Sequence, residues 1–226
     1  LRLFETARVF FEDKNSETMA REHGRLGLLL YGRRFDSLWP QSDDNLDYQD
    51  LKGLVEHLLR RLNLPAGQFS LENSHPWLAP CVRLTVAGRD VGVLGQVKPE
   101  IADAHNARLP VWVAELDSDA LRELAAGKTP AFSPLPLYPP VRRDITVMCP
   151  ETLRLEEVAG HIASLRLPWL EGVELADVFA PEGKAERNLT FRLTFRHAER
   201  TLNDAEVDKE REKVAQALVA ALPVRI

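Results

Sequence analysis

The strongest constraint on the fold is a run of alternating residues at 188–196. Apolar side chains occupy every second position of this run: Leu189, Phe191, Leu193 and Phe195. A period of two is typical of a β-strand that buries one face and exposes the other. Because the intervening positions are polar or cationic, the run predicts a strand in a sheet whose helices cover one face only.

A helix start follows this predicted strand. Asn203 is a favourable N-cap residue, and Glu206 stands three positions later, where its carboxylate can reach back to the amide of the cap. The apolar residues beyond it fall on one side of the predicted helix: Val207, Val214, Leu218 and Leu222. The segment therefore predicts a helix that packs on the buried face of the sheet.

Four further elements complete a pattern across residues 141–226. A short strand is expected at 142–148, and apolar residues at helical spacing follow it at 155–165. A second strand is expected at 173–179, and a third short one at 224–226 closes the chain. The order βαββαβ predicts a ferredoxin-like arrangement.

Proline residues mark a boundary inside the chain. Five of them lie between residues 128 and 140: Pro130, Pro134, Pro136, Pro139 and Pro140. Proline lacks an amide donor and favours extended backbone, so this stretch is typical of a linker. We expect a first domain at 1–127, a linker at 128–140 and a second domain at 141–226.

The first 127 residues predict strands mixed with helices, and the whole chain is therefore expected to be α+β. The expected strands are 3–11, 25–33, 81–87, 91–97 and 111–116. The expected helices begin at Asp47, after Pro99 and near Ser118. We expect residues 88–90 to form a hairpin turn and the polar join at 12–24 to be mobile.

Composition excludes several classes of protein. The formal net charge of −5 argues against nucleic-acid binding by bulk electrostatics, so any RNA contact has to be local. No apolar stretch approaches the roughly 20 residues of a membrane span, and no signal peptide is present, which predicts a cytoplasmic protein without a membrane partner. Cys81 and Cys149 are interpreted as small buried hydrophobes, and no metal site is expected. The start at Leu1 within a predicted strand suggests a fragment of a longer polypeptide.

The exposed face of the second predicted sheet is the candidate binding surface. Open sheets of this topology bind unpaired bases on exposed aromatic rings, while arginine contacts phosphates or ring faces. If Ala176 and Val178 are buried, Asp177 and Phe179 face the solvent together with the polar positions of the neighbouring strands. Those positions are Arg142, Asp144, Thr146, Asn188, Thr190, Arg192, Thr194 and Arg196. The alternative is that Phe179 packs against the linker and the arginines form ion pairs with carboxylates.

Several motifs resemble one family of proteins. RTLNDAEV at 200–207, with VRRDI at 141–145 upstream, resembles the ferredoxin-fold anticodon-binding domain that ends the β subunit of bacterial phenylalanyl-tRNA synthetases. LFETARVF at 3–10 and DYQDLKG at 47–53 are similar to segments of the synthetase-like domain of the same subunit. The segment QVK at 96–98 departs from that family, which more often has ELH there. The resemblance implies a partial class II synthetase-like antiparallel sheet domain, followed by the anticodon-binding domain.

The resemblance also implies which residues contact the anticodon bases. Carried over by position, they are Thr146, Asp177, Phe179 and Asn188. Phe179 stands where the family usually has Tyr, so the stacking face is kept and the hydroxyl is lost. Asn188 replaces Ser and Thr146 replaces Ala, and both changes alter the shape of a base pocket. With Arg142, Arg192 and Arg196 these four residues form the candidate RNA-binding set.

The resemblance implies that the chain is part of an (αβ)₂ enzyme. Its α subunit activates phenylalanine with ATP and Mg²⁺ and charges tRNA-Phe, and a second β subunit completes the assembly. We expect no catalytic, cofactor or metal residue in this chain. Class II adenylate sites need an arginine in a Phe-Arg-x-Glu strand and a second one in a Gly-x-Gly-x-x-Arg strand. RLFE at 2–5 has the wrong spacing, and Gly92 and Gly95 are not followed by that arginine.

Two alternatives stay open at this point. A catalytic single-chain synthetase of organelle type also ends in this domain, but it requires the two arginine motifs. The second alternative is a protein-protein interaction module on the same ferredoxin-like fold, whose sheet packs against a protein partner instead of RNA.

Overall fold

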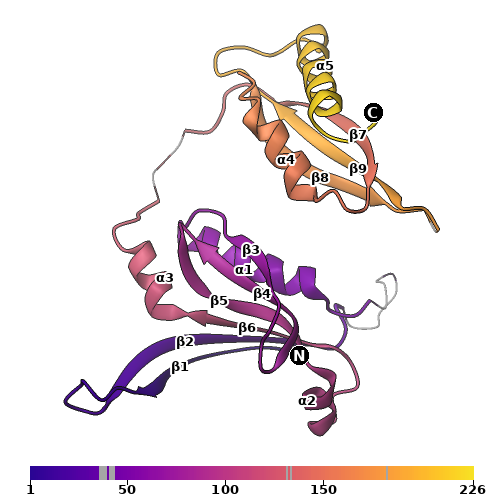
Figure 1. Cartoon of the computed structure of the whole chain (residues 1–226). Helices are drawn as coiled ribbons and strands as arrows, with labels where there is room; N and C mark the ends of the chain where they lie inside the picture. The colour runs from indigo at the N-terminus through magenta and orange to yellow at the C-terminus, as the bar shows by residue number, and fades with distance from the viewer. Residues whose placement is uncertain (36–39, 41–43, 131, 133, 182) are drawn as a thin grey trace. The chain divides into compact units, whose positions relative to one another are not determined.

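The computed structural model describes residues 1–35, 40, 44–130, 132, 134–181 and 183–226. The chain divides into two compact units, Leu1–Ala131 and Phe132–Ile226, here called the N-terminal and C-terminal units. Each unit combines a sheet with helices (Figure 1), which confirms the expected α+β class. Residues 131 and 133 of the expected linker lie outside the described residues, and its other residues are neither helix nor strand.

An antiparallel sheet of six strands forms the N-terminal unit, in the order β1-β2-β6-β5-β4-β3. Its strands are β1 Arg2–Glu12, β2 Ala20–Tyr31, β3 Gln68–Glu72, β4 Leu78–Val86, β5 Arg89–Val97 and β6 Val111–Asp117. Its helices are α1 Tyr48–Arg61, α2 Pro99–Ala104 and α3 Ser118–Ala125. Buried residues of α1 and α3 share one hydrophobic core with buried residues of the sheet, among them Leu51, Leu84 and Leu121. The two helices therefore cover the same face of the sheet.

Helix α1 begins where the sequence predicts. The Asp47 carboxylate accepts hydrogen bonds from the amides of Gln49 and Asp50, at 2.8 and 3.1 Å. The Asp50 carboxylate accepts one from the Asp47 amide at 2.9 Å, which completes a capping box. Arg34 donates to both carboxylates and ties the segment before the helix to its first turn.

Three features of the N-terminal unit differ from the elements expected from the sequence. Pairing of β1 with β2 continues to Glu12 and Ala20, so the polar join between the two strands is shortened to residues 13–19. The turn between β4 and β5 lies at Ala87 and Gly88, whose φ angles of 50° and 78° suit a tight hairpin, and not at 88–90. The short strand β3 was not expected at all, since its few residues carry a weak periodic signal.

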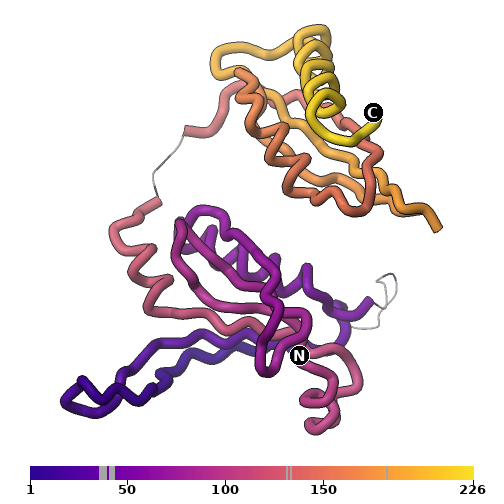
Figure 2. Tube along the Cα trace, in the orientation of Figure 1, coloured from indigo at the N-terminus to yellow at the C-terminus, as the bar shows by residue number. Residues whose placement is uncertain are grey.

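The C-terminal unit has the expected order of elements. They are β7 Val141–Pro150, α4 Leu155–Ser164, β8 Leu170–Phe179, β9 Glu186–Phe195 and α5 Asp204–Ala221. The sheet order is β7-β9-β8, so the strand with the alternating pattern lies in the centre. After α5 the chain returns beside β7 (Figure 2), where Arg225 and Met148 exchange two backbone hydrogen bonds of 2.8 and 2.9 Å. This pairing completes βαββαβ, although the last strand is reduced to one bridge.

Helices α4 and α5 cover one face of this sheet. The core beneath them combines Phe191 and Leu193 of β9 with Ile162 of α4 and Leu218 of α5. Val178 pairs with the core residue Leu189 and so faces this side of the sheet. Ala176 and Val178 were expected to be buried here, and that expectation was wrong, since both are exposed, Val178 by 48%. They belong to the edge strand β8, where a register shift lies between Leu175 and Asp177.

The cap of α5 has the predicted geometry. Asn203 accepts a hydrogen bond from the Glu206 amide at 3.0 Å, and the Glu206 carboxylate accepts one from the Asn203 amide at 3.1 Å. The Arg200 guanidinium donates to the same carboxylate at 2.6 and 2.9 Å. These hydrogen bonds, first from Arg200 and then from the Asn203 amide, lower the pKa of Glu206 to about 2.

This depressed pKa predicts acid sensitivity. The pKa of Glu206 is lower in the folded chain than its ordinary value of 4.5, so its stabilisation is complete above that pH and is lost as the pH falls towards 2. Urea unfolding at pH 7 and at about pH 3 should show a larger acid-induced loss of unfolding free energy in the wild type than in Glu206→Gln. The control is Glu212→Gln on the same helix, which should behave like the wild type. Equal losses in the wild type and Glu206→Gln would contradict this prediction.

None of the helices in the described parts of the chain has the length and apolar character needed to cross a membrane.

Candidate nucleic-acid interface

The open face of the C-terminal sheet is arranged in rows across its three strands. Residues that pair across antiparallel strands point to the same side, so each residue of β9 shares this face with its partners on β7 and β8. The four rows, in the order β7, β9, β8, are Met148, Asn188 and Phe179; Thr146, Thr190 and Asp177; Asp144, Arg192 and Glu174; Arg142, Thr194 and Gly172. Six of the seven candidate residues therefore lie in these rows.

Phe179 presents an aromatic ring to solvent at one end of this face. It is 57% exposed, and its partner Asn188 on the central strand is half-buried. Burial of a large apolar ring is favourable, so an exposed one on a sheet edge is a candidate contact site. A base stacked on this ring would gain about 1–3 kcal/mol.

A hydroxyl pair occupies the next row. Thr146 Oγ1 and Thr190 Oγ1 lie 3.0 Å apart, within hydrogen-bonding distance, and the Asp177 carboxylate shares their row on β8. Hydroxyls both donate and accept, whereas a carboxylate accepts only. The row beside Phe179 therefore offers both kinds of hydrogen-bonding group to the edge of a base.

Two arginines of the candidate set, Arg192 and Arg196, have side-chain partners within the chain. Arg192 donates to both oxygens of Asp144 at 2.9 Å and lowers the pKa of that carboxyl. Arg196 donates to Glu171 at 2.8 Å and to the Tyr138 carbonyl at 3.1 Å. The ion pairs that the alternative interpretation anticipated are therefore present. Both pairs are partly exposed, and such pairs contribute little to stability, so a phosphate can compete for them.

The candidate set extends over a long distance along β9. Arg196 follows Asn188 by eight positions, which corresponds to about 26 Å of extended strand. Arg142 and Arg196 consequently lie at the opposite end of the sheet from Phe179. A single base at the Phe179 end is therefore too far away to contact Arg142 and Arg196.

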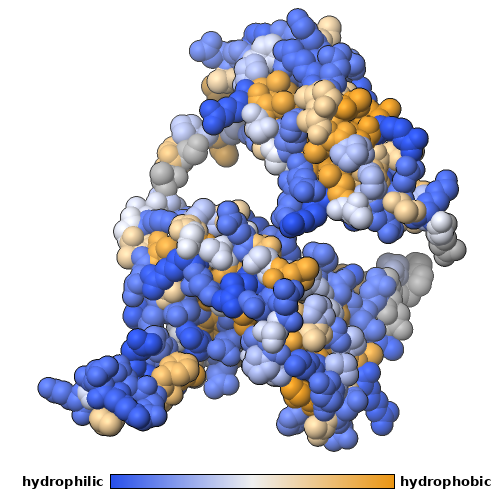
Figure 3. Space-filling model, in the orientation of Figure 1, coloured by the Kyte–Doolittle hydropathy of each residue, from blue (hydrophilic) through white to orange (hydrophobic). Residues whose placement is uncertain are grey.

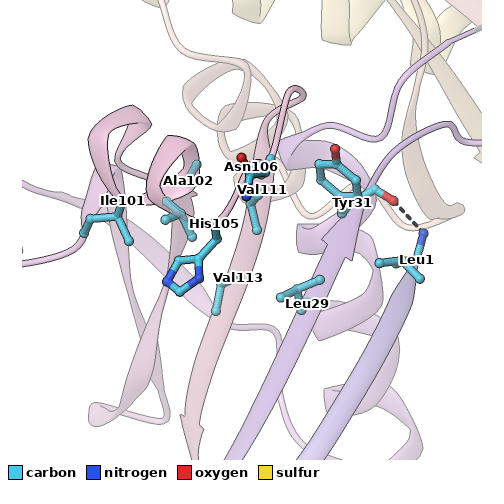
Figure 4. A pocket seen from close by; sticks show the side chains of 11 residues that line it. Leu1, Leu29, Tyr31, Ile101, Ala102, His105, Asn106, Val111 and Val113 are labelled. Carbon is cyan, nitrogen blue, oxygen red and sulfur yellow. Dashed lines mark hydrogen bonds between the residues drawn. The ribbon is translucent and has the colours of Figure 1, made fainter.

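The N-terminal unit has an apolar pocket on its sheet (Figure 4). The pocket has a volume of about 430 Å³ and lies beside α2. Its lining residues are Leu1, Leu29, Tyr31, Val97, Ile101, Ala102, His105, Asn106, Ala107, Val111 and Val113. This lining contains no lysine or arginine side chain to offset a phosphate, as adenylate chemistry requires.

A second hollow in this unit is polar, and its arginines are neutralised. Arg25 contacts Glu115 at 3.3 Å and Asp117 at 2.8 Å. Arg83 contacts Glu72 at 2.6 Å and also pairs with Asp90. Each guanidinium therefore has two carboxylates, and bound phosphate would meet excess negative charge. No group of three or more potential metal ligands occurs among the residues that the structure describes.

Family models match nearly all of the chain. Residues 1–118 match the phenylalanyl tRNA synthetase beta chain CLM domain, and residues 136–226 match the ferredoxin-fold anticodon binding domain. The chain belongs to the phenylalanyl-tRNA synthetase beta-chain family. The family resemblance and the fold class expected from the sequence are both confirmed.

Individual members of the family show the extent of the match. The chain is 60% identical to a phenylalanine–tRNA ligase beta subunit of Nitratidesulfovibrio vulgaris, over 100% of this chain and 28% of that protein. It is 54% identical to the one of Oleidesulfovibrio alaskensis, over 88% of this chain and 25% of that protein. It is 33% identical to the beta subunit of Symbiobacterium thermophilum, over 97% of this chain and 25% of that protein. The chain thus spans about a quarter of the length of these synthetase beta subunits.

The sequence analysis did not place two residues, Met148 and Arg225, on the open face of the C-terminal sheet. Met148 shares the row of Asn188 and Phe179, and Arg225 pairs with Met148 through the backbone. Alternation along β7 places Met148 on the same side as Thr146, so a period-two reading of that strand could have found it. Arg225 carries no such signal, because its position depends on how the last residues return to the sheet.

Proposed function

We propose that this chain is the tRNA-binding, anticodon-recognising and structural part of a phenylalanine–tRNA ligase beta subunit. The open face of β7, β9 and β8 would contact the anticodon of tRNA-Phe through Thr146, Asp177, Phe179 and Asn188. The observation that carries the proposal is the exposed ring of Phe179, which shares a row with a half-buried amide and lies next to a row of hydroxyls. The anticodon-binding family model over residues 136–226 supports it.

The proposal extends to the complete enzyme. In an (αβ)₂ assembly with a second beta subunit, the alpha subunit would use ATP and Mg²⁺ to charge tRNA-Phe, while this part of the beta subunit binds. The neutralised arginines and the apolar pocket of the N-terminal unit support a non-catalytic role for residues 1–127. They speak against the single-chain catalytic alternative. Residues 128–140 would link this domain to the anticodon-binding domain at 141–226.

Anticodon-dependent binding is the direct test. We expect the chain to bind tRNA-Phe more tightly than the same tRNA with its anticodon bases replaced. Each lost stacking contact should weaken binding about 5- to 150-fold. Fluorescence anisotropy with labelled transcripts at fixed ionic strength measures the two affinities. Equal affinities would contradict the proposal.

A protein-interaction module is the second candidate, because carboxylates already engage Arg192 and Arg196. The salt dependence of tRNA binding separates the two candidates. If these arginines contact phosphates, the double variant Arg192→Gln, Arg196→Gln should lower the slope of log affinity against log salt by about one for each contact. A binding surface for protein would leave tRNA affinity weak and its slope unchanged by the substitutions.

A further inference from the structure

We propose that Met148 and Arg225 complete a slot for a single nucleotide at the Phe179 end of the open face. Phe179 and Met148 form its two walls, Asn188 its floor, and Arg225 the contact to phosphate. This inference rests on the proposed anticodon-binding function and adds two residues to the candidate set.

The pairing of the strands fixes the size of the slot. Asn188 on the central strand pairs with Phe179 on one side and with Met148 on the other. Neighbouring strands lie about 4.8 Å apart, so the backbones of the two wall residues are separated by roughly 10 Å. Stacked bases are spaced by about 3.4 Å, so a base with a contact on each face needs roughly 7 Å. The row therefore has room for one base between two side chains.

Exposure and chemistry support the assignment of walls and floor. Phe179 is 57% exposed and Met148 is 38% exposed, whereas Asn188 between them is half-buried. An aromatic ring stacks on any base, and a thioether makes favourable contacts with aromatic groups. The amide of Asn188 has both a donor and an acceptor for the edge of the base.

Arg225 supplies positive charge directly beside the Met148 wall. Its Nη2 atom lies 3.3 Å from Met148 Sδ and donates to the two Glu186 oxygens at 2.7 and 2.9 Å. The backbone pairing with Met148 fixes this position, and the chain terminus lies beside β7 in Figure 1. The side chain is 69% exposed, and a guanidinium has five donors, so Glu186 leaves several of them for a phosphate. Arg192 lies two rows away and is bidentate to Asp144.

The charge of the chain fits a local site and not a broad cationic one. Figure 3 shows a hydrophobic area bordered by hydrophilic residues on the visible face of the C-terminal unit, but hydropathy does not distinguish cations from anions. With a net charge of −5, affinity for RNA has to come from a few placed contacts. One base slot with one phosphate contact is such a set of a few placed contacts.

Four variants of the 226-residue chain test the slot, with an anticodon stem-loop of tRNA-Phe as the probe. The test variants are Met148→Ala and Arg225→Gln. Leu155→Ala is matched to Met148, because Leu155 is 37% exposed and begins α4. Arg154→Gln is matched to Arg225, because Arg154 is 71% exposed on its side chain and is also paired with a glutamate, Glu156. Thermal melting confirms that each variant is folded.

We expect Met148→Ala to weaken binding roughly 2- to 12-fold, and the effect should disappear when the stacked base is replaced by an abasic site. Arg225→Gln should lower the salt slope by about one. The matched controls should bind like the wild type. If either test variant binds like the wild type while Phe179→Ala binds weakly, the slot is overturned and anticodon binding stands. If Phe179→Ala and anticodon replacement also have no effect, the proposed function itself fails.

Discussion

Phe179→Ala is expected to weaken the binding of tRNA-Phe about 5- to 150-fold. The side chain is 57% exposed at the end of the edge strand β8, so its removal costs stacking on RNA and little folding free energy. One stacked base is worth about 1–3 kcal/mol, which corresponds to the expected range. Equilibrium binding of labelled tRNA, with a parallel thermal melt, measures both consequences.

The neighbouring residue provides the control. Val178 is 48% exposed on the same strand and points to the opposite side of the sheet, because side chains alternate along a strand. Val178→Ala should therefore bind like the wild type. Phe179→Tyr keeps the ring face and should also bind well. A loss of affinity in Val178→Ala equal to that in Phe179→Ala would show a general effect on β8, and the assignment of a stacking site would then fail.

Phe191→Ala is expected to lower the free energy of unfolding of the C-terminal unit by about 3–5 kcal/mol. Phe191 is 1% exposed on the central strand β9 and belongs to the core beneath α4 and α5. Its removal leaves a cavity and loses apolar burial, two costs that add. Because small domains are stable by only about 5–15 kcal/mol, much of the stability of this unit would be lost. Urea unfolding followed by circular dichroism measures the change.

A phenylalanine outside the core is the matched control for this experiment. Phe132 is 90% exposed, so Phe132→Ala should change the stability by less than about 0.5 kcal/mol. A loss below about 1 kcal/mol in Phe191→Ala would show that the core does not depend on this ring. Phe191 and Phe179 lie on opposite faces of one sheet, so the two alanine variants separate loss of the scaffold from loss of the contact surface.

Local sequence signals predicted most of the C-terminal unit. Alternation along β9 assigned its buried and exposed faces, since the geometry of a strand alone imposes a period of two. The cap at Asn203 was predicted because its partner, Glu206, stands three positions away. Contacts this close in sequence depend on little beyond the local backbone.

Local sequence signals failed where the burial or existence of an element depends on its position at the edge of a sheet or on the register of its pairing. Val178 has the side chain of a core residue, but it lies after a register shift on an edge strand and remains exposed. The short strand β3 exists because β4 pairs with it, and its own residues signal it weakly. In both cases the deciding partner lies on another strand.

The candidate site likewise depends partly on local sequence signals and partly on the tertiary structure. The sequence by itself determined the family, the order of elements and which residues of β9 face away from the helices. Only the tertiary structure joined Arg192 to Asp144, 48 positions apart, and placed Met148, Asn188 and Phe179 in one row with Arg225 beside it. The physical reason is that faces follow from local backbone geometry, whereas neighbours across a sheet follow from strand order and register, which the packing of the whole unit sets.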